Sequence, residues 1–254
     1  MIIELFGPPA AGKTTFARNL AAHLQGMGQA VELILSFRPA ETIEPDGVDA
    51  LAPRPLAAMR RLTRPAIEYL ACMGFMSVGS RQTSIASELI ALLPPVSAVS
   101  LVRLHQYITR LESSWRLVEQ SDATVIIDQG FVQAVCSLVL HARTPSASAV
   151  EKALALIPKA DHWIRIDAPR HLLRARLEAR RHGQSWIERR FELDTETSLR
   201  SIEVFNMLDP ILRQHAPRIA RMGLDASWLL RDLPGITELC CAMTQPNAVG
   251  MRTR

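Results

Sequence analysis

The segment FGPPAAGKTT near the start of the chain most constrains what the chain can fold into. Gly7, Gly12, Lys13 and Thr14 match the pattern G-x-x-x-x-G-K-S/T, in which a glycine-rich loop joins a strand to a helix. The apolar run Ile2–Phe6 precedes the loop, and an apolar stripe with helical spacing follows it. The motif therefore lies in the context that it requires, and it predicts an α/β fold.

Loops of this kind bind phosphates through backbone N–H groups at the positive end of a helix. Pro8 and Pro9 have no N–H, but they lie early in the loop, where the chain turns, so we expect the donors to come from residues 10–14. Lys13 can reach the β- and γ-phosphates of a nucleotide, and the Thr14 hydroxyl can bind Mg²⁺. The predicted nucleotide-binding residues are Gly7, Ala10, Ala11, Gly12, Lys13, Thr14 and Thr15.

Five short apolar runs, rich in β-branched residues, predict the strands of one sheet. Several of them are apolar at consecutive positions, which is typical of strands covered on both faces. The runs are Ile2–Phe6, Ala30–Phe37, Thr124–Asp128, His162–Asp167 and Ile219–Leu224. We expect a P-loop three-layer sandwich, with a mainly parallel five-stranded sheet between layers of helices.

Residues 39–122 contain no convincing strand, and their prolines divide them into helices and loops. Helices are predicted at Leu56–Met73, Ser84–Leu93 and Val99–Gln120, and later at residues 169–183 and 195–215, the last kinked or interrupted at Pro210. We interpret residues 40–122 as a helical insertion within a single domain of residues 1–242; a second, independent domain is the alternative. Residues 243–254 are predicted to be a disordered tail.

The segment TVIIDQG places Asp128 at the end of a predicted strand. Because ligands bind at the carboxyl ends of parallel strands, Asp128 is expected to face the same crevice as Lys13. It could hold Mg²⁺ or accept a proton from the attacking group. An ordinary surface aspartate at a strand end is the alternative.

An arginine-rich stretch begins at Arg165 and ends at Arg190, with eight arginines and three acidic residues. Arg176 and Arg180 are four residues apart and share one face of the predicted helix, so both could reach a transferring phosphoryl group. The alternative is a solvated face with pairs such as Arg174 with Glu178.

Taken together, these segments resemble nucleoside and nucleotide kinases, and thymidylate kinases most closely. The likeness rests on FGPPAAGKTT, SFRPAE, VIIDQG, RIDAP with RARLEARRHG, and MGLDAS. It implies an ATP-dependent phosphotransferase that uses Mg²⁺, with Lys13, Asp128, Arg176 and Arg180 as catalytic residues. In that family the arginine-rich element, here about residues 170–192, is a lid over ATP. The family's last segment lies near the adenine, which implies Ala226 and its neighbours at the base pocket.

The departures from the family lie where the phosphoryl acceptor should bind. Gln129 stands where thymidylate kinases have Arg, and residues 46–118 match no thymidine pocket. Candidate residues for binding the phosphoryl acceptor are Arg38, Glu41 and Gln133, with Arg81 and Arg103 as weaker choices. For each of them the alternative is a surface position or a hydrogen bond within a helix. The loop also has Ala10 where many of these kinases have Gly, which removes easy access to a positive φ.

The predicted function is an ATP-dependent small-molecule kinase that transfers the γ-phosphoryl group to a nucleotide, a nucleoside or another small acceptor. A regulatory ATPase or nucleotide switch that acts on a protein partner is the alternative. Nucleic-acid binding is not expected, because aromatic residues make up 5% of the chain and do not alternate with the arginines.

The four cysteines have no metal-binding spacing, so we expect reduced thiols and a cytoplasmic location. Membrane association is not expected, because Glu88 and the Pro94–Pro95 pair break the longest apolar stretch. A homodimer is compatible with the sequence.

Overall fold

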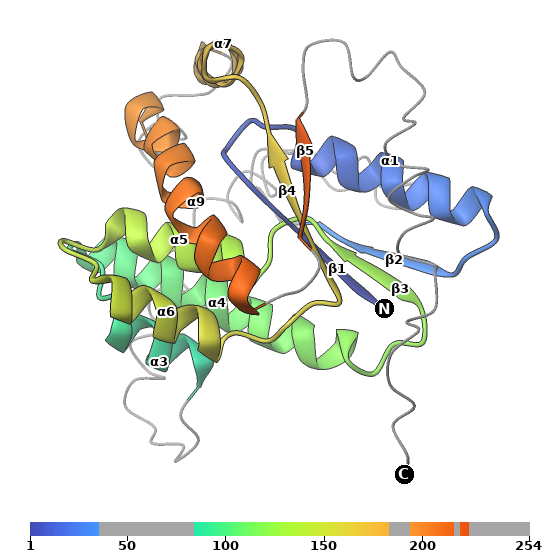
Figure 1. The fold of residues 1–254 in the computed structure, drawn as a ribbon, viewed down its shortest axis with the longest axis horizontal. Helices are drawn as coiled ribbons and strands as arrows, with labels where there is room; N and C mark the ends of the chain where they lie inside the picture. The colour runs from blue at the N-terminus through green and yellow to red at the C-terminus, as the bar shows by residue number, and fades with distance from the viewer. Residues whose placement is uncertain (36–83, 183–193, 216–218, 224–254) are drawn as a thin grey trace, which may run out of the picture.

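A five-stranded parallel sheet forms the centre of the molecule (Figure 1). The computed structural model describes residues 1–35, 84–182, 194–215 and 219–223. Strand order is β2-β3-β1-β4-β5, and every neighbouring pair is parallel. The strands are β1 Ile2–Phe6, β2 Val31–Ile34, β3 Thr124–Ile127, β4 His162–Asp167 and β5 Ile219–Gly223. The predicted α/β fold and all five predicted strands are confirmed.

Helices follow the strands and cover both faces of the sheet. They are α1 Lys13–Gly26, α3 Ile85–Leu92, α4 Ala98–Val118, α5 Phe131–His141, α6 Ala147–Leu156, α7 Arg170–His182 and α9 Thr195–His215. Ser84, Ser97 and Ser146 fix the starts of α3, α4 and α6, because each hydroxyl accepts a hydrogen bond from the backbone N–H three residues later. Helix α9 is continuous through Pro210, where the sequence predicts a kink or an interruption.

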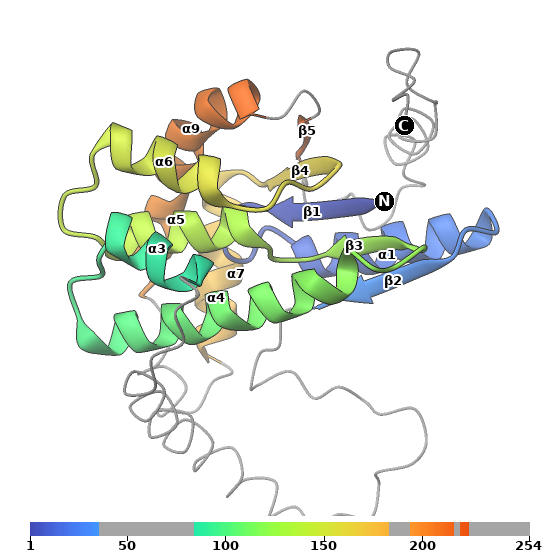
Figure 2. The ribbon, with the colours of Figure 1, turned by 90° about the horizontal axis from the view of Figure 1, so that it is seen from below.

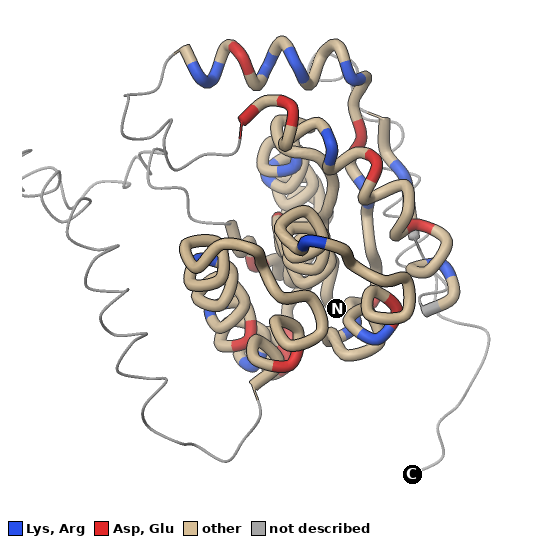
Figure 3. The backbone as a smooth tube through the Cα atoms, turned by 90° about the vertical axis from the view of Figure 1, so that its left-hand side faces the viewer, with Lys and Arg blue, Asp and Glu red and all other residues tan. Residues whose placement is uncertain are grey.

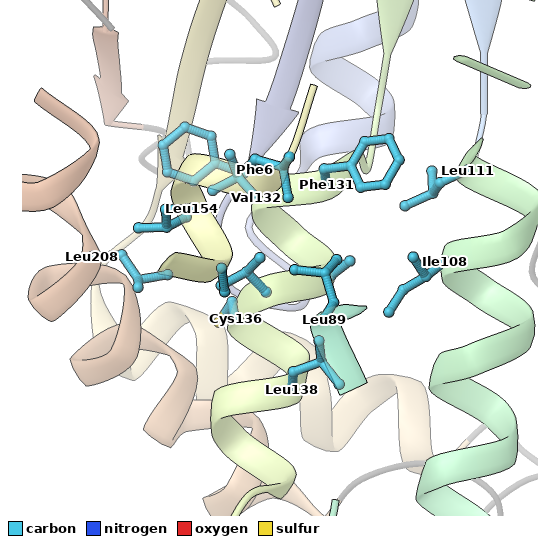
Figure 4. Close-up of a cluster of buried hydrophobic side chains, with 14 of the residues drawn as sticks. Phe6, Leu89, Ile108, Leu111, Phe131, Val132, Cys136, Leu138, Leu154 and Leu208 are labelled. Atoms are coloured by element: carbon cyan, nitrogen blue, oxygen red, sulfur yellow. The ribbon is translucent and has the colours of Figure 1, made fainter. Parts of the chain in front are cut away.

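Side chains alternate across the sheet, so the core has two halves. Ile3 and Leu5 of β1 pack with α1 and α7 on one face. Phe6 points to the other face, where α3 to α6 and α9 gather (Figures 1 and 2). Figure 4 shows this second cluster, in which Phe131, Val132 and Cys136 of α5 lie among side chains of the neighbouring helices. The carboxyl ends of β1 and β3 therefore lie side by side between two packed layers.

Helices α5 and α6 are absent from the sequence prediction. Helix α5 has the sequence FVQAVCSLVLH, which is apolar on nearly every side because the helix is buried between α4, α6 and α9. A short, mostly apolar run of this kind can be a buried strand or a buried helix, and periodicity alone does not separate the two. A mostly apolar segment directly after Gly130, in which only Gln133, Ser137 and His141 are polar, is the signal that could have identified it.

The described part of the helical insertion is helical as predicted. Helices α3 and α4 lie close to the bounds predicted for them, and both pack in the core of one sheet face. The helix predicted at Leu56–Met73 lies outside the described residues, and the single-domain organisation stays a prediction. In the part of the chain that the structure describes, every helix is too short or too polar to cross a bilayer.

Candidate functional site

The loop between β1 and α1 has the backbone shape of a phosphate cradle. Gly7 has φ 144° and Gly12 has φ 100°, both in the range that favours glycine. A Cβ atom on Gly7 would lie 2.1 Å from the Ile166 carbonyl oxygen of β4, so no side chain fits there. Gly12 is the N-cap of α1 and directs the loop into the first turn of the helix. The local sequence thus places the loop at the positive end of α1.

Ala10 adopts a left-handed conformation, with φ 63°, although the sequence predicts that an alanine there has no easy access to positive φ. It is the one non-glycine residue with positive φ among the described residues. Such a conformation costs an L-residue roughly 1–2 kcal/mol. Backbone strain of this kind gathers at ligand-binding sites, where the surrounding structure holds it.

Lys13 lies over the loop with its side chain almost fully buried. Its Nζ donates hydrogen bonds to the Gly7 oxygen at 2.8 Å and to the Pro8 oxygen at 2.9 Å. The Ala11 N–H also donates to the Pro8 oxygen, at 3.3 Å, so one predicted phosphate donor has a long bond within the loop. The ammonium charge is therefore held at the cradle by carbonyl oxygens, where it can meet a phosphate.

Thr14, in the first turn of α1, forms a hydrogen bond with Asp128, which lies directly after β3. The Thr14 Oγ1 hydroxyl donates to Asp128 Oδ2 at 2.6 Å, and the aspartate is fully buried directly after β3. Asp128 thus joins the cradle, and the surface-aspartate alternative does not describe it. Because the hydroxyl proton points at Asp128, the lone pairs of Oγ1 are left for a cation.

This donor set fits Mg²⁺. In phosphoryl-transfer sites Mg²⁺ is held by one or two protein oxygens together with phosphate and water. Thr14 and Asp128 are such a pair, next to a loop shaped for phosphates. The described ranges contain no cluster of three His, Cys, Asp or Glu side chains that could hold a metal ion without a nucleotide.

Helix α7 is the arginine-rich element, in which arginines outnumber acidic residues (Figure 3, the helix at the top), and its arginines have different partners. Arg176 Nη1 donates to the Ala10 oxygen of the loop at 3.3 Å, and Arg180 lies one turn further along, half-buried. Arg174 instead forms an ion pair with Glu196 of α9 at 2.7 Å, not with Glu178 as the alternative interpretation supposes. Arg176 therefore contacts the loop between β1 and α1, and Arg174 connects α7 to α9.

Arg165, at the start of the arginine-rich stretch, has a structural role. Its side chain is 1% exposed within β4, and its Nη1 lies 2.6 Å from the Asp209 carboxylate of α9. The same guanidinium bonds Asp167 at 3.0 Å and Asn206 at 2.8 Å, and it lies over the Phe205 ring. This network fastens α9 to the sheet, so Arg165 is not available to a phosphate.

Gln133 and Glu4 are buried polar side chains beneath the loop. Gln133 Oε1 accepts a hydrogen bond from the Gly7 N–H at 3.2 Å. Gln133, which the sequence predicts to bind the phosphoryl acceptor, therefore contacts the loop between β1 and α1. Glu4 Oε1 accepts from the Val132 N–H at 2.7 Å. Complete burial raises the pKa of Glu4 from 4.5 to about 8, and the Val132 N–H and the Trp163 indole partly oppose this shift. The Glu4 carboxyl is therefore neutral at pH 7.

Glu4 is absent from the sequence prediction, although one signal was available. An acidic residue in the middle of the apolar strand IIELF is unusual, because burying a carboxyl is costly unless it has a partner. The other predicted residues are only partly brought together. Thr15 is exposed on α1, and Arg103 is exposed on α4. Arg38, Glu41, Arg81 and Ala226 lie outside the described residues.

A comparison with protein-family models and with curated proteins finds no match. Among solved structures, the chain matches a deoxyadenosine kinase from M. mycoides with bound dATP at 11% identity and a TM-score of 0.47. It matches a thymidylate kinase from Ehrlichia chaffeensis at 14% identity and a TM-score of 0.41. Each match covers 96% of this chain and 98% of the other.

Proposed function

We propose that this protein is an ATP-dependent kinase for a small molecule. The terminal phosphorus–oxygen bond of ATP breaks, ADP leaves, and an oxygen atom of the acceptor forms the new bond to phosphorus. The acceptor class is a nucleotide, a nucleoside or another small molecule with a free hydroxyl or phosphate. Mg²⁺, held by Thr14 and Asp128, would neutralise charge on the phosphates.

One observation carries this proposal: the phosphate loop and the strand-end aspartate are joined by the bond of 2.6 Å between Thr14 and Asp128. A glycine-rich loop alone could be a structural turn, and a buried aspartate alone could be a helix or loop partner. Their direct contact puts a hydroxyl, a carboxylate and the Lys13 ammonium around one cradle. These are the groups that phosphoryl transfer requires.

The remaining residues would act on the charge that develops during transfer. Lys13 would bind the β- and γ-phosphates, and Arg176 and Arg180 would approach the transferring group from α7. The bond from Arg176 to the Ala10 oxygen supports this role, because it puts the guanidinium at the rim of the cradle. Arg38 and Glu41 would contact the acceptor, Ala226 the adenine base, and Gln133 the acceptor or the loop.

A regulatory ATPase is the competing function, since a switch would also need Lys13, Thr14 and Asp128. The arginine at the loop does not separate the two functions, because a cation next to the γ-phosphate accelerates transfer to water as well as to a small acceptor. The two functions differ in what accelerates turnover. A kinase releases ADP faster when its small-molecule acceptor is present, whereas a switch responds to a protein partner.

The test is a screen for acceptor-dependent ADP release in Mg·ATP. Nucleosides, nucleotides, sugars and aminoglycosides would each be added at about 1 mM, the upper end of typical KM values. We expect one class to raise the rate well above basal hydrolysis, with a phosphorylated product seen by mass spectrometry. Binding of ATP with no stimulation by any acceptor, but with stimulation by a protein, would instead support the switch.

A further inference from the structure

Two side-chain contacts connect the first turn of α5 to β1 and to the loop between β1 and α1. The Val132 N–H donates to Glu4 Oε1 at 2.7 Å, and Gln133 Oε1 accepts from the Gly7 N–H at 3.2 Å. Glu4 is fully buried, and Gln133 is 8% exposed. Each contact joins residues more than 120 positions apart in the sequence.

The Glu4 contact replaces an ordinary helix cap. Helix α5 begins after Gly130, which has no side chain and makes no capping bond, so its first N–H groups need another acceptor. Glu4 supplies one from the neighbouring strand. A Cβ atom on Gly130 would lie 2.4 Å from the Glu4 side chain, so a glycine at that position gives the carboxyl its space. If Glu4 and Gln133 only filled space in the core, apolar residues of similar size would pack equally well at both positions.

These contacts lie where the sheet no longer holds the two segments together. The register of β1 with β3 ends at the pair Glu4 and Ile127, and Asp128 is the next residue. Gly7 opens the phosphate loop, and Gly130 follows Asp128 by two residues. From the other side, the Tyr107 hydroxyl of α4 donates to the Gly130 oxygen at 3.3 Å. The turn after Asp128 is therefore tied to its surroundings by side chains.

We infer that Glu4 and Gln133 are positioning residues for the Mg²⁺ site, and this inference rests on the proposed function. They hold the Asp128 turn against the phosphate loop, so that Thr14 and Asp128 keep the distance of 2.6 Å between their oxygens. Neither residue has to touch the metal ion or the nucleotide for this role. Partners that orient metal ligands in this way commonly change metal affinity by about 10–100-fold when they are replaced.

The test measures how much Mg²⁺ strengthens binding of a fluorescent β,γ-imido analogue of ATP. In Gln133→Met and Glu4→Met, which remove the accepting oxygen at similar volume, we expect the Mg²⁺-dependent gain in affinity to fall at least tenfold, while affinity in EDTA changes less. Glu4→Gln keeps an oxygen for the Val132 N–H and should restore most of the gain. Ser201→Ala, which removes a buried hydroxyl on α9, is the control for general loss of stability.

A wild-type gain in both Met variants would overturn the positioning role, as would an equal loss in Ser201→Ala. Should Glu4→Met not fold, Gln133→Met decides alone, and Gln133→Glu then serves as the variant that keeps the accepting oxygen. The wild-type protein separates this inference from the proposed function. If the wild-type protein fails to bind the analogue at all, the proposed function is contradicted. If the wild type binds the analogue and both Met variants show the same Mg²⁺-dependent gain in affinity, only the positioning role is contradicted.

Discussion

Replacing Glu4 by Gln should change how the stability of the protein depends on pH. Burial raises the pKa of Glu4 from 4.5 to about 8 in the folded state, so between those values the folded protein holds a proton there that the unfolded chain has released. Stability from this group is therefore full below pH 4.5 and is lost as the pH rises towards 8. Gln has the same shape, keeps an oxygen for the Val132 N–H, and does not titrate.

The size of the effect follows from the pKa shift. Each pH unit between the two values removes about 1.4 kcal/mol from the free energy of unfolding. From pH 5 to pH 8 the difference in stability between Glu4→Gln and wild type should therefore shift by ~4 kcal/mol in favour of the variant. This change is a large fraction of the 5–15 kcal/mol that is roughly typical of folded proteins.

The assay is urea unfolding at pH 5, 6, 7 and 8, followed by tryptophan fluorescence. Other groups also titrate in this range, but they cancel in the difference between variant and wild type. Glu151→Gln is the matched control, because it removes an exposed carboxylate from α6 and should run parallel to wild type. A Glu4→Gln curve that is also parallel to wild type would refute the argument that the carboxyl is buried and neutral.

Two further substitutions test the loop and α7. Ala10→Gly should remove the strain of the left-handed conformation at φ 63°, and the larger entropy that Gly loses on folding should offset part of this gain. The net effect should be a stabilisation of about 0.5–1 kcal/mol, which raises Tm by about 2 °C. In the control Ala11→Gly, where φ is not positive, Tm should fall instead. Arg176→Ala should lower kcat about a hundredfold, while Arg174→Ala, whose partner is Glu196 on α9, should leave kcat near the wild-type value. Equal effects in the two Arg variants would argue against a role for Arg176 in transfer.

The sequence predicted the elements that carry strong local signals. The strands were visible because a doubly covered parallel strand is apolar throughout, and the phosphate loop because its glycines have fixed spacing. The proximity of Asp128 to the loop followed from the rule for the carboxyl ends of parallel strands. In each case a local pattern determines the structure with little help from distant residues.

The contacts of buried polar groups could not be predicted in the same way. Glu4 with Val132, and Gly7 with Gln133, join residues that are distant in the sequence, and only the packed position of α5 brings them together. The role of Arg165 was hidden for a similar reason, since its partner Asp209 lies on α9. A run of arginines shows charge, but it does not show which of them already have a carboxylate.

The central claim, that the cradle binds Mg·ATP for phosphoryl transfer, is tested most directly at Lys13. The measurement is the rate of acceptor-dependent ADP release by wild type and by Lys13→Ala at saturating Mg·ATP, with circular dichroism to show that the variant is folded. We predict that the variant loses at least about a hundredfold in rate. A folded Lys13→Ala protein that turns over ATP at the wild-type rate would contradict the account.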